Sequence, residues 1–159
     1  MPSKAKDSHV DDLRRLMQRL FRRFGALAVD TTPCGQPLSM AHGHALLVLL
    51  AQGELSQLEL GRELCIDKSN VARLCARMVE AGHLVQKQSR QDGRSRRVSL
   101  TARGKRMALE VDESSGARFG ALLAGLGPTQ RPRVLEALRH LVTALDALPS
   151  RTTNERTPR

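Results

Sequence analysis

Aromatic residues are nearly absent from this 159-residue sequence. It contains three Phe and no Trp or Tyr, although 40% of its residues are hydrophobic. A core with so few rings must be filled mainly by Leu, Val, Ala and Met, and Leu and Ala favour helices over strands. The composition therefore predicts a mainly α protein, and the length is enough for about one domain with a buried core.

Long hydrophobic runs are also lacking. No segment approaches the roughly 18 apolar residues of a membrane-spanning helix, and residues 1–12 lack the apolar region of a signal peptide. We therefore expect a soluble, intracellular protein with no membrane partner.

Cysteines and catalytic motifs give little support for a metal centre or an enzyme. The three cysteines form no CxxC pair, which argues against a disulfide framework and a compact zinc ribbon. The motifs GxxxxGK, HExxH and GxSxG are missing. The sequence predicts a protein that is not an enzyme and that binds no cofactor and no metal.

Positive charge, in contrast, is abundant. The chain has 26 Lys and Arg against 16 Asp and Glu, a formal net charge of +10. An excess of this size indicates a polyanionic partner, because each phosphate that the protein neutralises releases counterions. Charge alone does not separate DNA from RNA or from an acidic membrane.

Apolar periodicity and capping residues predict helices through most of the chain. We expect a first helix from Val10 to Ala28, a second from Ser39 to Ala51, a third from Ser56 to about Cys65, a fourth from Lys68 to about Ala81, a fifth that opens at Thr101 and a last one after Pro128.

Two short strands are expected at residues 83–88 and 97–100, joined by a polar hairpin with Asp92-Gly93 at its tip. Helix, short helix, turn, helix and hairpin follow one another in the order of a winged helix-turn-helix. The hairpin is rich in arginine, and such a loop can place an Arg in the narrow minor groove of DNA. The arginines in question are Arg90, Arg94, Arg96 and Arg97.

The fourth expected helix has two contrasting faces. Helical spacing puts Val71, Leu74, Cys75 and Met78 on one face, and Ser69, Asn70, Arg73 and Arg77 on the roughly opposite one. The polar face is ordinary solvated surface or, in a winged helix-turn-helix, the surface that meets base edges and phosphates in the major groove. The arginine-rich hairpin directly after it favours DNA binding.

Residues 38–107 resemble the MarR (multiple antibiotic resistance regulator) family of bacterial transcription factors. The resemblance rests on residues 55–105, and above all on Asp92-Gly-Arg94 followed by Val98-Ser-Leu-Thr101 and Gly104, which match the family's wing in residue type and spacing. It implies a winged helix-turn-helix at residues 38–103, flanked by terminal dimerisation helices in a cytoplasmic, nucleoid-associated protein.

The resemblance also implies roles for individual residues. Arg94 enters the minor groove and Asp92 stabilises the wing by pairing with an Arg; the less favoured alternative for Asp92 is a plain turn residue before Gly93. Arg77 either contacts a phosphate or is that partner of Asp92, and both alternatives stay open. The residues expected to contact DNA are Lys68, Ser69, Asn70, Arg73, Arg77, Arg94 and Arg96.

The ends of the chain predict a homodimer. The first and the last two helices have more apolar surface than a small winged domain can cover, and MarR-like proteins dimerise through these helices. We expect one domain over residues 1–159, with a helical dimerisation region at 9–30 and 104–148 and a disordered basic tail at 149–159.

The sequence holds few candidate residues for sensing a signal. The resemblance implies release of DNA by a small phenolic or aromatic effector or by cysteine oxidation. His42 and His44 are candidates for effector binding, although two residues apart they point to different faces, and surface or satisfied histidines are the alternative. Cys34, in a Pro/Gly loop, is the oxidation candidate, whereas Cys65 and Cys75 are expected in the core.

These observations predict a sequence-specific regulator of transcription that binds double-stranded DNA, acting as a ligand- or stress-responsive repressor on a pseudopalindromic operator. The alternative is a non-specific architectural DNA-binding protein. A face that only seeks phosphates would be mostly Lys, so the mixture of Ser69, Asn70 and Arg73 favours the regulator.

Overall fold

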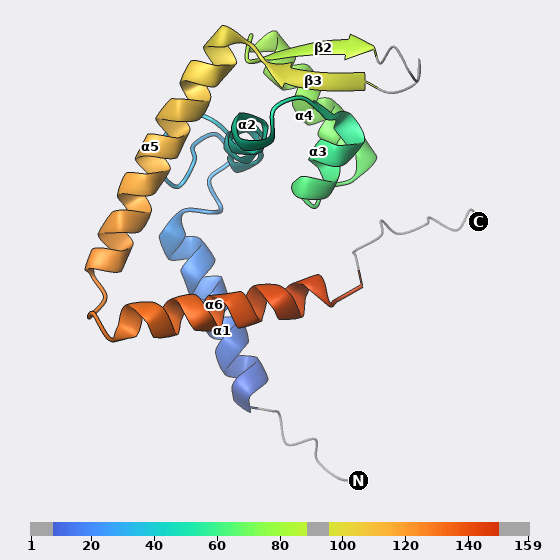
Figure 1. The fold of residues 1–159 in the computed structure, drawn as a ribbon. Helices are drawn as coiled ribbons and strands as arrows, with labels where there is room; N and C mark the ends of the chain where they lie inside the picture. Colours follow the sequence, from blue (N-terminus) through green and yellow to red (C-terminus); the bar gives the residue numbers. More distant parts are fainter. Residues whose placement is uncertain (1–7, 89–95, 150–159) are drawn as a thin grey trace, which may run out of the picture. The chain divides into compact units, whose positions relative to one another are not determined.

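A computed structural model describes residues 8–88 and 96–149 of the chain. Within these ranges the protein has six helices and three short strands, so the prediction of a mainly α fold with a small β wing is confirmed (Figure 1). The elements are α1 (Ser8–Phe24), α2 (Met40–Gln52), β1 (Leu55–Ser56), α3 (Gln57–Glu63), α4 (Lys68–Glu80), β2 (Leu84–Gln88), β3 (Arg96–Leu100), α5 (Ala102–Ala124) and α6 (Gln130–Asp146).

The N-terminal caps lie where the sequence predicts them. Ser39 accepts a hydrogen bond from the backbone N–H of His42, and Ser56 and Glu59 form the complete capping box of α3. Asp67 Oδ1 accepts from the Asn70 N–H at 2.8 Å and so begins α4. These caps satisfy backbone donors that have no partner inside the helix.

The first helix is shorter than its apolar pattern suggests. α1 ends at Phe24, because Gly25 follows with a φ of +90° and its N–H bonds to the Phe21 carbonyl. This left-handed conformation suits glycine and stops the helix. Leu27 therefore continues the apolar spacing but lies outside the helix.

The wing is part of a three-stranded antiparallel sheet in which β3 lies between β1 and β2. Leu84 pairs with Leu100 at the base of the wing, and Leu55 of β1 pairs with Val98. β1 was not predicted, because a strand of two residues is too short to show alternation.

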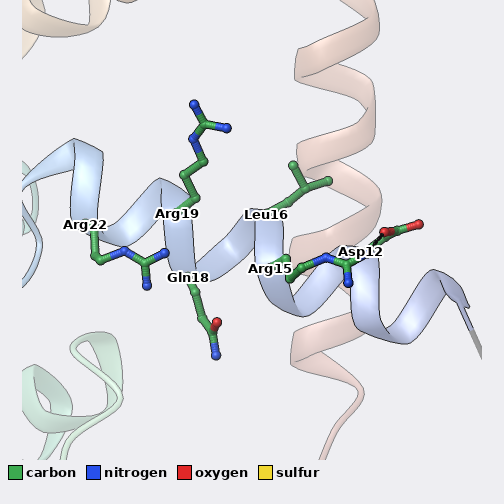
Figure 2. Close-up of a pocket in the computed structure, with 6 residues that line it drawn as sticks. All are labelled: Asp12, Arg15, Leu16, Gln18, Arg19 and Arg22. Atoms are coloured by element: carbon green, nitrogen blue, oxygen red, sulfur yellow. Dashed lines mark hydrogen bonds and ion pairs between the residues drawn. The ribbon is translucent and has the colours of Figure 1, made fainter. Parts of the chain in front are cut away.

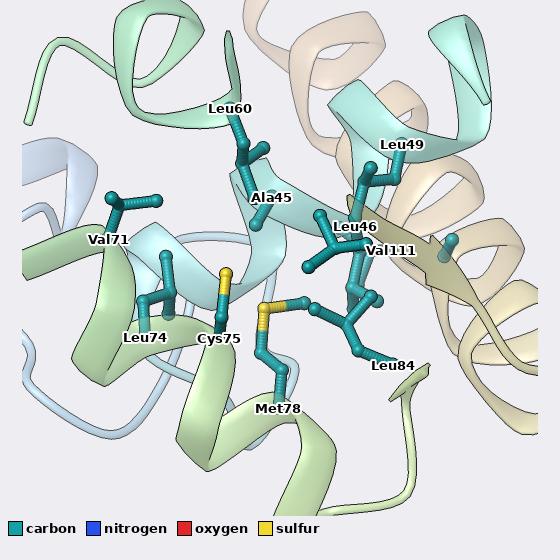
Figure 3. Packing of buried hydrophobic residues seen from close by; sticks show 12 residues of the cluster. Ala45, Leu46, Leu49, Leu60, Val71, Leu74, Cys75, Met78, Leu84 and Val111 are labelled. Carbon is teal, nitrogen blue, oxygen red and sulfur yellow. The ribbon is translucent and has the colours of Figure 1, made fainter. Parts of the chain in front are cut away.

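The hydrophobic core joins α2, α3 and α4 to the sheet and to the first turns of α5. It contains no aromatic residue, and Cys75 and Met78 fill space among aliphatic side chains (Figure 3). The face of α4 that was predicted to be apolar is buried here. The core residues are Ala45, Leu46, Leu49, Leu60, Val71, Leu74, Cys75, Met78, Leu84, Val98, Ala108 and Val111.

The start of α5 lies against the turn that precedes β2. Thr101 Oγ1 donates to the Gly82 carbonyl at 2.7 Å and accepts the N–H of Gly104 at 2.9 Å. A Cβ added to Gly104 would lie 2.0 Å from the His83 carbonyl oxygen, so only glycine fits at this position. The wing and α5 are thereby fixed to the end of α4.

By its contacts the chain divides into two compact units, Met1–Ser115 and Gly116–Arg159. In the second unit, Arg131 Nε donates to the carbonyls of Leu123 and Leu126 and so holds the turn before α6. The expectation of a single domain stays a prediction, and residues 150–159 of the expected tail lie outside the described ranges. No helix in the described ranges is both long and apolar enough to cross a membrane.

Candidate nucleic-acid interface

The polar face of α4 is exposed along its whole length. The five α4 residues that were predicted to contact DNA are all classed as exposed, whereas the four predicted apolar residues of the same helix are buried. Burial of one face therefore fixes which side chains the other presents to solvent. The exposed residues are Lys68, Ser69, Asn70, Arg73 and Arg77.

Three of the side chains at the start of α4 form a hydrogen-bonded chain. The Asn70 amide nitrogen donates to Asp67 Oδ2 at 2.7 Å, and Arg73 Nη2 donates to Asn70 Oδ1 at 2.7 Å. Asp67 also caps the helix through its other oxygen. Asp67 therefore fixes the side chain of Asn70, and Asn70 in turn fixes the guanidinium of Arg73.

Two arginines at the start of β3 give this part of the wing positive charge. Arg96 is exposed and pairs in register with Gln88. Arg97 Nε donates to Glu54 Oε1 at 2.6 Å, and its Nη2 donates to the Glu54 carbonyl. Arg97 thus links β3 to the residue before β1, an ion pair that the sequence spacing of 43 positions did not suggest.

Asp92 and Arg94 lie outside the described residues. Their predicted roles in the wing, and the alternative partner of Arg77, therefore stay predictions. The strands on either side of them, β2 and β3, are paired in register from Leu84–Leu100 to Gln88–Arg96.

The two candidate effector histidines have different environments. His44 is exposed, whereas His42 is buried and its Nε2 lies 2.9 Å from Nδ1 of His83. The two rings meet edge to face, with centroids 5.1 Å apart. His42 therefore pairs with His83, a residue predicted at the start of a strand, and not with His44.

Burial keeps this pair neutral. Desolvation lowers the pKa of His42 to about 4, and repulsion from the charged forms of His83 and Arg77 adds to this effect. Desolvation and Arg103 likewise lower the pKa of His83. In neutral histidines one ring nitrogen donates and the other accepts, so the contact between them is a hydrogen bond. His83 Nε2 is buried and has no hydrogen-bond partner in the described part of the chain.

Cys34 lies in a polar setting at the loop between α1 and α2. Its Sγ is 3.1 Å from Thr32 Oγ1, and Gln36 Nε2 of the same loop donates to Ser114 Oγ of α5. Burial acts to raise the pKa of the Cys34 thiol, but hydrogen bonds with Thr32, Ser114 and the backbone outweigh it, so the pKa is lowered. The thiol is half-buried.

The prediction that Cys65 is a core residue is wrong. Cys65 is exposed and has a φ of +52°, because it lies beyond the end of α3 in the turn to α4. The turn takes it off the apolar face of α3, and Ile66 packs against the core instead. Cys75 is buried as predicted, and burial raises the pKa of its thiol.

A hollow on the surface lies along α1 and is lined by that helix alone (Figure 2). Three of its six lining residues are arginines, and one of them, Arg15, forms an ion pair with Asp12. With walls from one helix only, it is not an enclosed cavity for a small molecule. The lining residues are Asp12, Arg15, Leu16, Gln18, Arg19 and Arg22.

Comparison with known proteins identifies the central part of the chain. The sequence model of the MarR family matches residues 36–95, which span α2 to the hairpin. No curated protein matches the sequence.

Solved structures share the fold at low sequence identity. FabT from Streptococcus pneumoniae, solved in complex with DNA, has a TM-score of 0.72 and 18% identity over 86% of this chain and 99% of its own. BpsR from Bordetella bronchiseptica has a TM-score of 0.69 and 21% identity, covering 82% and 98%. A MarR transcriptional regulator from Methanosarcina mazei Go1 has a TM-score of 0.68 and 20% identity, covering 89% and 100%.

Proteins of this family regulate transcription and are not enzymes. Residues 36–95 thus match the MarR family, and the described residues have the winged helix-turn-helix fold of solved MarR-type transcriptional regulators.

Proposed function

We propose that this protein is a homodimeric repressor that binds a pseudopalindromic site in double-stranded DNA. The exposed polar face of α4 carries the proposal, because it combines cationic and hydrogen-bonding side chains above a fully apolar buried face. In this arrangement α4 enters the major groove and the arginine-rich wing follows the neighbouring minor groove. The net charge of +10 strengthens contact with phosphates.

The residues proposed to contact DNA divide into two groups by chemistry. Ser69, Asn70 and Arg73 lie on the first two turns of α4, where side chains reach base edges. Lys68 and Arg77 supply charge for phosphates on either side of them. In the wing, Arg96 and Arg94 extend the basic surface towards the minor groove.

Exposed apolar faces on the terminal helices support dimerisation. In α1, Val10, Leu13, Leu16 and Leu20 are each between 46% and 66% exposed. In α6 no residue is buried, and Leu138 and Leu145 are 45% and 54% exposed. Large apolar side chains at helical spacing on both terminal helices are typical of protein interfaces, and a second copy of the chain would cover them.

A small aromatic acid is the proposed effector. Of the proteins with this fold, BpsR has its DNA binding regulated by 6-hydroxynicotinic acid, and NadR was solved with 4-hydroxyphenylacetate. His42 or His44 would supply a polar contact, and oxidation of Cys34 is the other proposed signal. A screen of aromatic carboxylates and of peroxide for release of bound DNA tests both.

The decisive experiment is a footprint on DNA from upstream of the protein's own gene. A specific regulator protects a short pseudopalindrome, whose half-sites lie about one helical turn, roughly 34 Å, apart. An architectural protein instead protects DNA broadly and without a preferred sequence, and this outcome would contradict the proposal. The salt concentration and the amount of competitor DNA must be held constant throughout the experiment, because phosphate contacts alone give strong binding at low salt.

A further inference from the structure

The hydrogen-bonded chain at the start of α4 assigns different roles to two residues that were both expected to contact bases. Resting on the DNA-binding function proposed above, we infer that Arg73 reads a guanine in each half-site and that Asn70 positions Arg73 and is not a base reader. The observations are the two 2.7 Å hydrogen bonds that run from Asp67 through the Asn70 amide to the Arg73 guanidinium.

The amide of Asn70 is directed at its helix neighbours. An Asn that reads adenine places its amide nitrogen and its amide oxygen together on the N7 and N6 edge of one base. Here the nitrogen is directed back to Asp67 and the oxygen forward to Arg73. Turning the amide towards an adenine competes with both hydrogen bonds, and the bond to Asp67 involves a carboxylate and is therefore among the stronger ones.

The guanidinium of Arg73 remains available. One of its five N–H groups is used by Asn70, which leaves enough donors for a bidentate contact. Two parallel N–H groups match the O6 and N7 acceptors of guanine, the commonest specific contact of Arg in the major groove. Fixing the side chain in advance reduces the rotamer freedom that is lost when the base is bound.

The two carboxylate oxygens of Asp67 have separate roles in this arrangement. Oδ1 caps the helix through the Asn70 N–H, whereas Oδ2 holds the Asn70 side chain. A Ser at position 67 can perform the first task and not the second, since Ser and Asp are similarly good N-caps. Asp67→Ser therefore separates helix stability from the orientation of Asn70.

The test is selection of binding sites from a random duplex library, followed by titration of the selected site and of variants with one base changed. The wild type is expected to select a guanine in each half-site that it prefers over the other bases by about tenfold. Arg73→Lys keeps the charge but loses the bidentate fork, so this preference should disappear while affinity for unrelated DNA is retained. Arg139→Lys, the same change on exposed α6, is the matched control and should leave the preference intact.

Asn70→Ala and Asp67→Ser should each weaken the preference at that same guanine by about threefold, an effect between none and that of Arg73→Lys. The double variant should lose no more of the guanine preference than either single variant, because both changes break the same series of hydrogen bonds. The ratio between bases is the readout, since removal of the Asp67 charge strengthens binding to all sequences equally and cancels in the ratio. Thermal unfolding of Asp67→Ser should stay close to that of the wild type.

Two results would overturn the inference. In the first, Asn70→Ala leaves the guanine preference unchanged. In the second, it abolishes a preference for adenine at another position, which would make Asn70 a base reader. If instead the wild type selects no sequence at all, the proposed function itself fails, and this outcome is distinct from both.

Discussion

A buried pair of histidines connects the start of α2 with the end of α4. His42 and His83 are 8% and 4% exposed, and the ring nitrogens that join them are 2.9 Å apart. Among the described residues, the charged side chains outside the pair that act on the two rings are Arg77 and Arg103, and no acidic group is among them. The pair is therefore stable only while both rings are neutral.

This burial predicts that the protein loses stability in mild acid. The pKa of His42 falls from 6.5 in the unfolded chain to about 4 in the folded one, so protons bind preferentially to the unfolded chain. The stabilisation is complete above about pH 6.5 and declines as the pH falls towards 4. Between pH 7.5 and 5.0 the free energy of unfolding should drop by about 2 kcal/mol through this group. Urea denaturation at both pH values measures it.

The control for this prediction is a second histidine of the same helix. His42→Gln should flatten the pH dependence, whereas His44→Gln, at an exposed position, should leave it unchanged. Equal pH dependence in both variants would show that His42 is not the group responsible.

Two glycines of α5 are predicted to respond to the same substitution with opposite signs. At Gly104 an added Cβ would lie 2.0 Å from a backbone oxygen, so Gly104→Ala should destabilise the fold by about 3 kcal/mol. At Gly116 nothing lies within 4 Å, and Gly116→Ala should stabilise the helix by about 1 kcal/mol. Thermal unfolding of the two variants, compared with the wild type, distinguishes these effects.

At the scale of elements, the wing holds two arginines that are predicted to differ in function. Arg97 is engaged with Glu54 and ties β3 to the residue before β1. Arg94→Ala should weaken binding to the protected DNA by about 1–3 kcal/mol. Arg97→Ala removes the same charge but should cost less than half as much, because its guanidinium is already paired. Comparable losses in a gel-shift titration would mean that the wing acts only through its total charge.

The elements themselves could largely be predicted from the sequence, because their signals are local. The capping residues Ser39, Ser56 and Asp67 and the two faces of α4 depend on neighbours within one or two turns. The features that were missed depend on distant residues: β1 exists only through pairing with β3, and His42 meets a residue 41 positions away. The position of Cys65 was wrong for a third reason, since a left-handed turn interrupted the helical spacing used to predict it.

At the scale of the whole molecule, the apolar faces of α1 and α6 predict a dimer of about 35 kDa, twice the chain mass of 17.5 kDa. Leu138→Asp places a charge on an exposed apolar face, so it should shift the protein to the monomer without unfolding it. His140→Asp introduces the same residue on a different side of α6 and should remain dimeric. Light scattering at micromolar concentration measures both, and a monomeric wild type would contradict the dimer.

The turn between α3 and α4 offers one practical use. Cys65 is exposed in that turn, two residues before the N-cap of α4, whereas Cys75 is buried in the core. A maleimide dye attached to Cys65 in a Cys34→Ser background would stand beside the surface proposed to meet DNA. Its fluorescence would follow occupancy in real time without a label on the nucleic acid.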